Sequence, residues 1–183
     1  AGELLLENAK QIIAIHENLE QNMKTISSKR PLRIGATLTV GTNIMAKIVK
    51  GIEEEKSDID CFVHVNNTDH IEQMLLYNEL DIAVVEGIID HKEIITAPAF
   101  DDNLCIICSK EHPLASKEVI TPDDLHNQQF ILREKGSGTR KIFEQLMRNH
   151  HIPYKVKWES NSTPAITDAV SYNLGLAFVP VRC

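Results

Sequence analysis

The sequence has no long apolar run and no excess of basic residues. None of its hydrophobic segments approaches the length needed to cross a bilayer, and its opening segment carries acids and amides where a signal peptide has a basic and then an unbroken apolar region. Its 19 lysines and arginines are outnumbered by 26 aspartates and glutamates, for a formal net charge of -7. Such a surface is poorly suited to gripping a polyanion. We therefore expect a cytoplasmic protein with no membrane partner and with any DNA-binding surface outside these 183 residues.

Cysteine is scarce, and its spacing does not support a metal site. Cys105 and Cys108 have the C-x-x-C spacing of zinc sites, but they lie in NLCIICS, which has the pattern of a β-strand. Side chains three residues apart in a strand point to opposite faces, so both thiols cannot bind one ion. His150 and His151 follow a helix-like segment, where imidazoles interact favourably with the helix dipole. We expect buried structural thiols, a solvated helix end, and no metal or other cofactor.

The loop REKGSGTR, residues 133–140, lacks the spacing of two familiar motifs. A phosphate-binding P-loop needs four residues between its glycines and a lysine after the second, whereas Gly136 and Gly138 are two apart and Thr139 follows. A nucleophile elbow needs the pattern G-x-S-x-G, which Ser137 does not have. Since no nucleophile, base and orienting group can be recognised by their spacing either, we expect no enzymatic activity.

The same loop retains the features of an anion-binding turn. Its glycines permit close backbone approach, Ser137 and Thr139 supply hydroxyl groups, and Arg140 offers a bidentate partner for a carboxylate or another oxyanion. A plain capped helix start explains these residues equally well, and the residues alone leave both interpretations open.

Apolar residues recur at every seventh position near the N-terminus. Heptad spacing with charged and amide residues between is typical of a coiled-coil seam, so we expect a helix over about residues 3–27 that needs a partner, followed by a break at residues 27–31. An amphipathic helix packed on its own domain is the alternative. The seam consists of Leu5, Ile12, Leu19 and Ile26, with Ala9, His16 and Met23 four residues after the first three.

From Leu32 onward, strand-like and helix-like segments alternate, which predicts two α/β lobes with crossover helices. Trp158 alternates with lysines and is expected to pack against a core, and Gly175 is expected to cap a helix. The predicted strands cover residues 32–36, 60–65, 80–86, 104–109, 129–133, 154–159 and 176–180. Helices are predicted over residues 42–55 and 68–78, from a capping residue at Thr121, from the glycine loop to about residue 149, and from Thr163.

Small hydroxyl and amide residues follow four of these predicted strands. Ligands of α/β lobes bind at such positions, because the first N–H groups of the next helix lack partners and its positive dipole end points there. If the two lobes face each other, these turns converge on one cleft. The turns are Thr37-Leu38-Thr39, Asn66-Asn67-Thr68, Ser137-Gly138-Thr139-Arg140 and Asn161-Ser162-Thr163.

Five segments resemble, in order, the effector-sensing region of LysR-type transcriptional regulators: LRIGATLTVGTNIMAKIV, NELDIAVVEG, NLCIICSKEHPLA, FILREKGSGTR and NLGLAFVP. The resemblance covers residues 31–180, and the heptad segment before it resembles the linker helix that the family uses for dimerisation. It implies two Rossmann-like subdomains of the type 2 periplasmic-binding-protein kind, with a central ligand cleft and a preceding linker helix. On this basis residues 1–30 are the linker and hinge, residues 31–100 the first subdomain and residues 101–183 the second, with the family's C-terminal return to the first subdomain expected to be missing.

The resemblance also implies partners and a site. The partner is a small-molecule effector, with a carboxylate or other small anion as the favoured class, although Val40 stands where the family has an amide or small residue and argues against a full sulfate-type hydrogen-bond set. A homodimer or homotetramer is expected, with DNA bound only through an N-terminal winged helix-turn-helix absent from this chain. The alternative is an extracytoplasmic solute-binding protein of the same bilobal fold. The expected effector contacts are Thr37, Leu38, Thr39, Asn67, Thr68, Ser137, Gly138, Thr139, Arg140 and Asn161.

Overall fold

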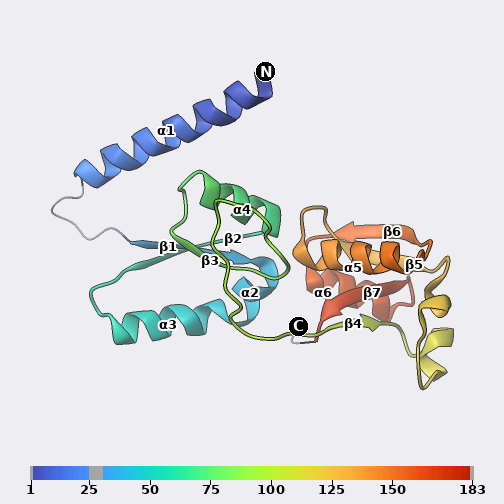
Figure 1. The fold of residues 1–183 in the computed structure, drawn as a ribbon. Helices are drawn as coiled ribbons and strands as arrows, with labels where there is room; N and C mark the ends of the chain where they lie inside the picture. The colour runs from blue at the N-terminus through green and yellow to red at the C-terminus, as the bar shows by residue number, and fades with distance from the viewer. Residues whose placement is uncertain (1, 25–30, 182–183) are drawn as a thin grey trace. The chain divides into compact units, whose positions relative to one another are not determined.

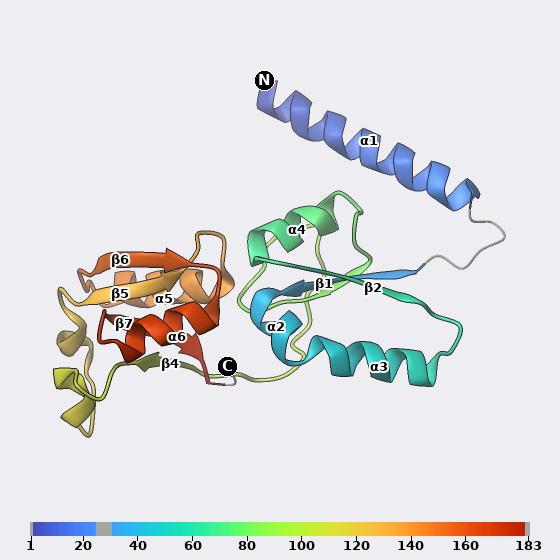
Figure 2. The same cartoon turned by 180° about the vertical axis from the view of Figure 1, so that it is seen from behind.

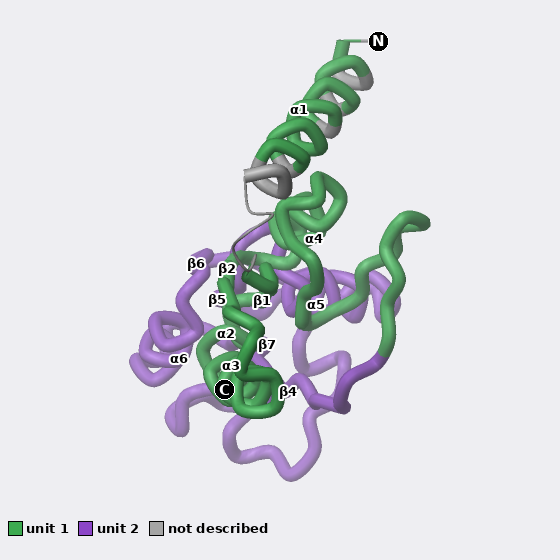
Figure 3. The backbone as a smooth tube through the Cα atoms, turned by 90° about the vertical axis from the view of Figure 1, so that its left-hand side faces the viewer, with its two compact units in different colours: residues 1–97 green, residues 98–183 purple. Residues whose placement is uncertain are grey.

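The computed structural model describes residues 2–24 and 31–181, and the chain divides into two compact units between Ala97 and Pro98 (Figure 3). Each unit has its own sheet and its own apolar core. Within the described ranges, no helix combines the length and the apolar character that a membrane span requires.

The first helix, α1, spans Gly2–Lys24, close to the predicted range (Figure 1). Three apolar residues of the heptad seam are exposed to solvent: Leu5 at 71%, Ile12 at 68% and Leu19 at 57%. Ile26 and residues 27–30 of the predicted break lie outside the described residues. The described part of the seam is therefore a row of large apolar side chains that no described residue covers.

Unit 1 is built on a parallel three-stranded sheet with the order β2-β1-β3. The carboxyl ends of parallel strands lie at one edge of a sheet, so the turns that follow β1 and β2 are neighbours there. The elements are β1 Leu32–Thr37, α2 Leu38–Asn43, α3 Met45–Glu55, β2 Cys61–Asn66, α4 Thr68–Leu76 and β3 Ile82–Val84.

Different helices cover the two faces of this sheet (Figures 1 and 2). On one face, Ile34 and Ala36 of β1 pack in a core with Met45, Ile48 and neighbouring residues of α3. On the other face, Gly35 allows α4 and the following segment to approach closely. A Cβ at Gly35 would lie 2.6 Å from the side chain of Leu80, so the packing requires glycine at this position.

The helix predicted at residues 42–55 begins earlier and is interrupted. α2 starts at Leu38, directly after β1, and Ile44 separates it from α3 with a φ of -130°. The N-cap residue of α2 is Thr37, a residue type that often caps helices, but its side chain makes no capping hydrogen bond here. The strand predicted at residues 80–86 is also shorter, at Ile82–Val84.

Unit 2 is built on a four-stranded mixed sheet with the order β4-β7-β5-β6, in which β4 is antiparallel to β7 and the other pairs are parallel. The strands predicted at residues 129–133 and 176–180 have those bounds in the structure. The elements are β4 Leu104–Ile107, the 3-10 helices η1 Pro113–Ser116 and η2 Pro122–Leu125, β5 Gln129–Arg133, α5 Gly138–Asn149, β6 Lys155–Ser160, α6 Thr163–Ser171 and β7 Leu176–Pro180.

The central strands of unit 2 are buried on both faces. Phe130 and Leu132 of β5 face the core under α5, whereas Ile131 faces the core under α6. The two cysteines near β4 divide in the same way: Cys108 packs against the α5 core and Cys105 against the α6 core. This confirms the prediction that their side chains lie on opposite faces, and both thiols are free.

The prediction that Trp158 packs against a core is wrong. β6 is an edge strand, and Trp158 is 44% exposed on it. A register shift pairs Phe130 with Val156 and Ile131 with Trp158, so Lys157 opposes no residue of β5. Alternation shows which strand residues share a face, but it does not show whether another element covers that face.

The prediction that Gly175 caps α6 is also wrong. Asn173 takes the left-handed position with a φ of 56°, and the N–H of Leu174 bonds the carbonyl of Ala169 at 3.2 Å, as in a Schellman motif. Gly175 serves packing instead. A Cβ at Gly175 would lie 2.8 Å from the carbonyl oxygen of Gln129 on the neighbouring strand.

α5 ends in the same motif. His151 has a φ of 53°, and the N–H of Ile152 bonds the carbonyl of Met147 at 2.9 Å. His150 and His151 are both exposed, which confirms the predicted solvated helix end. The buried Ile152 then returns the chain to the core.

Candidate functional site

The turn after β1 contains two buried threonines with different bonding. The hydroxyl of Thr37 accepts a hydrogen bond from the N–H of Glu86 at 3.2 Å. Thr39, in the first turn of α2, is only 8% exposed, and its hydroxyl has no hydrogen-bond partner among the described residues. Leaving a hydroxyl buried and unpaired costs about 1 to 3 kcal/mol, so Thr39 is a candidate for bonding a molecule that the chain itself does not supply. Leu38, between the two threonines, is half-buried.

The turn after β2 lies beside it, since Thr37 is the register partner of Asn66. The hydroxyl of Thr68 donates to the carbonyl oxygen of Glu86 at 3.3 Å, and the side-chain oxygen of Asn67 caps α4 by accepting the N–H of His70 at 3.0 Å. Thr37 and Thr68 thus hold the backbone of Glu86 from its two sides. Nothing in the sequence indicates this role of Glu86, which is the last residue of a predicted strand.

In unit 2, the residues from Gly136 to Arg140, called here the 136–140 loop, include the end of the turn after β5 and the first residues of α5. Gly136 has a φ of 89°, a left-handed value that favours glycine, and the N–H of Ser137 closes the turn on the carbonyl of Glu134 at 3.2 Å. Ser137 is the N-cap residue of α5 and is buried, but its hydroxyl makes no capping hydrogen bond. A plain capped helix start therefore does not account for Ser137.

Thr139, like Thr39, is buried with a hydroxyl that no described residue bonds. It is 2% exposed in the first turn of α5, and its hydroxyl finds no hydrogen-bond partner in residues 2–24 and 31–181. Both threonines follow the carboxyl end of a strand that is not at the edge of its sheet, β1 in unit 1 and β5 in unit 2. The two units thus carry the same unusual feature at equivalent places.

Arg140 is buried, at 7% exposure, and bonds groups of its own unit. Its Nε donates to Glu144 at 2.8 Å, and its Nη1 donates to the carbonyl of Arg133 at 3.0 Å and to the carboxylate of Glu159. Burial by itself would lower the pKa of Arg140, but the bonds to Glu144 and Glu159 outweigh it and raise this pKa. The bond to Arg140 in turn lowers the pKa of Glu159.

Asn161 is exposed and directly follows β6. The next residue, Ser162, caps α6 by accepting the N–H of Ala165 at 3.3 Å, and the helix begins at Thr163 as predicted. β5 and β6 are parallel, and Arg133 is the register partner of Ser160. The 136–140 loop and the turn at Asn161 therefore follow neighbouring strand ends.

A hollow of about 190 Å³ lies beside the 136–140 loop. Besides loop residues, its lining includes Lys135, Lys141 and Glu144, which were not among the predicted site residues. The flanking basic residues in REKGSGTRK were a usable signal for the two lysines. For Glu144, one helical turn after Arg140, the i,i+4 spacing was the signal.

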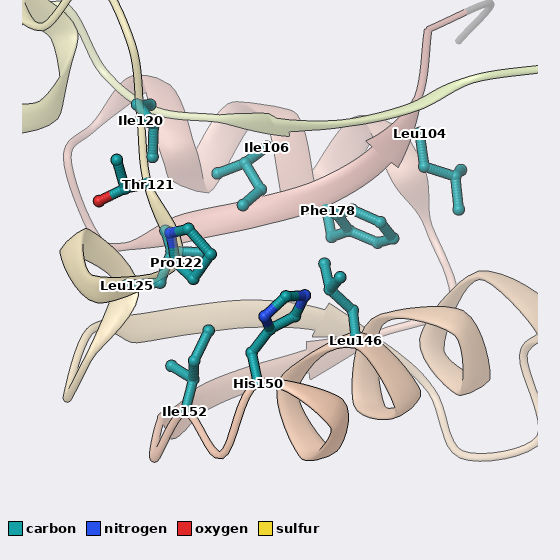
Figure 4. Close-up of a pocket in the computed structure, with 10 residues that line it drawn as sticks. All are labelled: Leu104, Ile106, Ile120, Thr121, Pro122, Leu125, Leu146, His150, Ile152 and Phe178. Atoms are coloured by element: carbon teal, nitrogen blue, oxygen red, sulfur yellow. The ribbon is translucent and has the colours of Figure 1, made fainter.

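A larger hollow of about 380 Å³ is apolar and lies elsewhere in unit 2, between the β4–β7 part of the sheet and the C-terminal half of α5 (Figure 4). Ile106 and Phe178 line it from the sheet, and Leu146 and His150 line it from α5. None of the predicted effector residues lines this hollow. Across the ranges described, no group of three or more histidine, cysteine, aspartate or glutamate side chains could hold a metal ion.

Residues 27–183 match the family model for the LysR substrate binding domain. Among curated proteins, the chain is 26% identical over 178 residues to CysL, an HTH-type transcriptional regulator of Bacillus subtilis, covering 96% of the chain and 60% of CysL. It is 32% identical over 186 residues to a "Probable RuBisCO transcriptional regulator" of Phaeodactylum tricornutum, covering 97% of the chain and 61% of that protein. The chain thus spans about 60% of the length of these relatives.

Solved structures agree with this match. The regulatory domain of CcmR from Synechocystis PCC6803, in complex with 2-PG, has a TM-score of 0.74 and 28% identity, covering 83% of this chain and 73% of that one. The effector-binding domain of QuiR, in complex with shikimate, has a TM-score of 0.75 at 21% identity, covering 84% and 74%, and supports the fold alone. The predicted pair of α/β subdomains of the type 2 periplasmic-binding-protein kind is confirmed, and the regulator prediction is favoured over the solute-binding alternative. The chain belongs to the LysR family and contains the effector-binding domain of that family.

Proposed function

We propose that this chain senses a small anionic metabolite for a LysR-type transcriptional regulator and transmits its binding to DNA-binding heads. In this proposal, residues 31–100 and 101–183 form the two halves of a cleft, and the effector binds between them. The output is a change in transcription rather than a chemical product, so we expect no enzymatic turnover. The regulator would act in the cytoplasm, where its operator DNA is.

The observation that carries the proposal is the pair of unpartnered hydroxyls of Thr39 and Thr139. Each is buried in the first turn of the helix that follows an inner strand, and neither has a partner among the residues described. A protein whose polar groups serve only its own fold pairs nearly all of them. Two such hydroxyls, at equivalent places in the two units, support a ligand-binding role for both turns.

An anion is the class of effector that the surrounding groups favour. The first N–H groups of α5 and the positive end of its dipole lie at the 136–140 loop, and Lys135 and Lys141 line the hollow beside it. CcmR, which is 28% identical, was solved with 2-PG. We therefore propose that Thr39, Ser137 and Thr139 contact the effector, with Gly138 approaching by its backbone and Asn161 at the rim.

The remaining predicted contacts lie at the same turns. Thr37, Asn67 and Thr68 hydrogen-bond the chain itself in the structure, so we propose that they shape the unit 1 side of the site, with Leu38 lining it. Outside the cleft, the exposed heptad seam of α1 supports assembly as a homodimer or homotetramer. DNA would then be bound by an N-terminal winged helix-turn-helix. The name of CysL, an HTH-type transcriptional regulator, supports this part of the proposal.

Isothermal titration calorimetry of the chain with 2-PG, sulfate and shikimate tests the proposal. We expect at least one of these three anions to bind with a dissociation constant below 1 mM, about -4 kcal/mol or stronger. Thr39→Val and Thr139→Val should each weaken that binding about tenfold or more. Thr96→Val, at an exposed position before the unit boundary, is the matched control and should bind as the wild type does.

Two results would count against the proposal. One is a folded wild-type chain that binds none of the three anions at millimolar concentration. The other is undiminished binding by both threonine variants, which would place the ligand away from the two hydroxyls.

A further inference from the structure

Arg140 joins the two turns of unit 2 that the proposed function uses. Its Nη1 bonds the carbonyl of Arg133 at the end of β5 and the carboxylate of Glu159 near the end of β6. Glu159 is the register partner of Leu132 and lies two residues before Asn161. The guanidinium of Arg140 therefore ties the start of α5 to the strand that leads into the Asn161 turn.

Both partners of the bond between Arg140 and Glu159 make further contacts. The bond from Arg140 is the main cause of the lowered pKa of Glu159, and the backbone N–H of Lys135, just before the loop, lowers it further. Glu144, one turn along α5, holds Nε of the same guanidinium at 2.8 Å. Two carboxylates thus face one buried guanidinium, so its positive charge is balanced within the unit.

The balanced charge makes Arg140 a poor direct partner for an effector anion. A guanidinium that already holds two carboxylates has little net positive charge to offer an effector anion, and both carboxylates would lie near that anion and repel it. Lys135 and Lys141 also line the hollow and add positive charge there. A planar, multiply bonded guanidinium is better suited to fixing the geometry of two backbone segments.

We propose that Arg140 is a positioning residue, which holds the 136–140 loop against the end of β6 so that Ser137, Thr139 and Asn161 are presented together. The inference rests on the proposed function for the identity of the site, but the tie itself is independent of any effector. It differs from the direct pairing with an anion that the sequence predicts for Arg140, and the two roles respond oppositely to a change at Glu159.

Two variants of the full chain separate the roles: Arg140→Lys, which keeps the charge and loses the multiple bonds, and Glu159→Gln, which removes one partner. Arg148→Lys, an exposed position on the same helix, is the matched control. Amide hydrogen exchange of residues 160–162 is measured first, in protein without ligand. A positioning role predicts exchange at least tenfold faster in Arg140→Lys and Glu159→Gln, with no change in Arg148→Lys.

Binding of 2-PG is measured next, by calorimetry. If Arg140 positions the loop, Glu159→Gln weakens binding about tenfold, as Arg140→Lys does, and the double variant is no worse than either single one. If Arg140 contacts the anion, Glu159→Gln leaves binding unchanged or tightens it, because the competing carboxylate is gone. That outcome, or unchanged exchange at residues 160–162, would overturn the inference. If the wild type does not bind 2-PG, this result counts against the proposed effector and not against the role of Arg140. The hydrogen-exchange measurement, made without ligand, still decides that role.

Discussion

The hydroxyl of Thr37 accepts a hydrogen bond from the backbone N–H of Glu86, which follows it in the chain by 49 residues. The bond joins the end of β1 to the segment after β3 and keeps that segment at the edge of the sheet where the candidate site lies. Thr68 holds the carbonyl of the same residue. Thr37 and Thr68, which were predicted to contact the effector, therefore stabilise unit 1 itself.

Thr37→Val should destabilise the protein. The valine fills the same buried space but removes the acceptor of the Glu86 N–H, which costs about 1 to 3 kcal/mol. Thr37→Ser keeps the acceptor and should cost less. Urea unfolding measures both, and the exposed Thr96→Val should stay within about 0.5 kcal/mol of the wild type. A Thr37→Val protein as stable as the wild type would mean that the bond contributes little.

Thr139→Val should behave in the opposite way. Its hydroxyl is buried without a partner among the described residues, so the change removes an uncompensated polar group and alters helix propensity little. We expect a stability equal to the wild type or up to about 1 kcal/mol higher in the absence of ligand, together with the loss of anion affinity described above. Thermal unfolding with and without 2-PG checks both halves. Destabilisation without ligand would show that the hydroxyl serves the fold.

The fold was largely predictable because burial on both faces leaves a continuous apolar run. QFILR and LAFVP are predicted as strands for this reason, and the structure has both with the predicted bounds. Trp158 failed because its strand is at the edge, and the position of a strand in a sheet depends on pairing with distant segments. Gly175 failed because a close contact with Gln129, 46 residues earlier in the chain, leaves no local mark.

The candidate site was predictable only as a set of turns. Hydroxyl residues after strands mark where a ligand can bind, but Thr37 and Thr39 look alike in the sequence and differ in whether a distant N–H reaches them. The roles of Glu86, Glu144 and Glu159 follow from tertiary contacts with Thr37, Thr68 and Arg140.

Gly175→Ala and Gly51→Ala should shift stability in opposite directions. An added Cβ at Gly175 meets the carbonyl oxygen of Gln129 at 2.8 Å, so the strands must move, at a cost of about 1 to 3 kcal/mol. Gly51 lies within α3 with nothing within 4 Å of an added Cβ, and alanine there should stabilise the helix by up to about 1 kcal/mol. Chemical unfolding of the two variants side by side is the measurement. Equal effects of both changes would contradict the close contact at Gly175.

Ile12→Glu should weaken assembly of the chain. Ile12 lies at the centre of the heptad seam and is exposed within the chain, so a charge there would be buried in any interface that uses the seam. Lys10→Glu introduces the same residue at an exposed position outside the seam and is the control. Sedimentation velocity should show a smaller species for Ile12→Glu alone. The same sedimentation of both variants and the wild type would exclude the seam as the main contact.

The pair of Lys117 and Asp124 should make stability fall at acidic pH. The hydrogen bond from Lys117, with that from the backbone of Thr121, lowers the pKa of Asp124 from 3.8 to about 2. A carboxyl with a lowered pKa in the folded state stabilises the protein above its unfolded pKa, and this contribution is lost as the pH falls from about 4 to about 2. Asp124→Asn removes the titration, so its deficit against the wild type should be largest near neutral pH and shrink across that interval. Asp123→Asn, whose side chain is 97% exposed, controls for the change in net charge. Urea midpoints at pH 7, 4 and 3 give the comparison, and a deficit that is constant over these values would mean that the bonds seen at Asp124 do not favour its charged form.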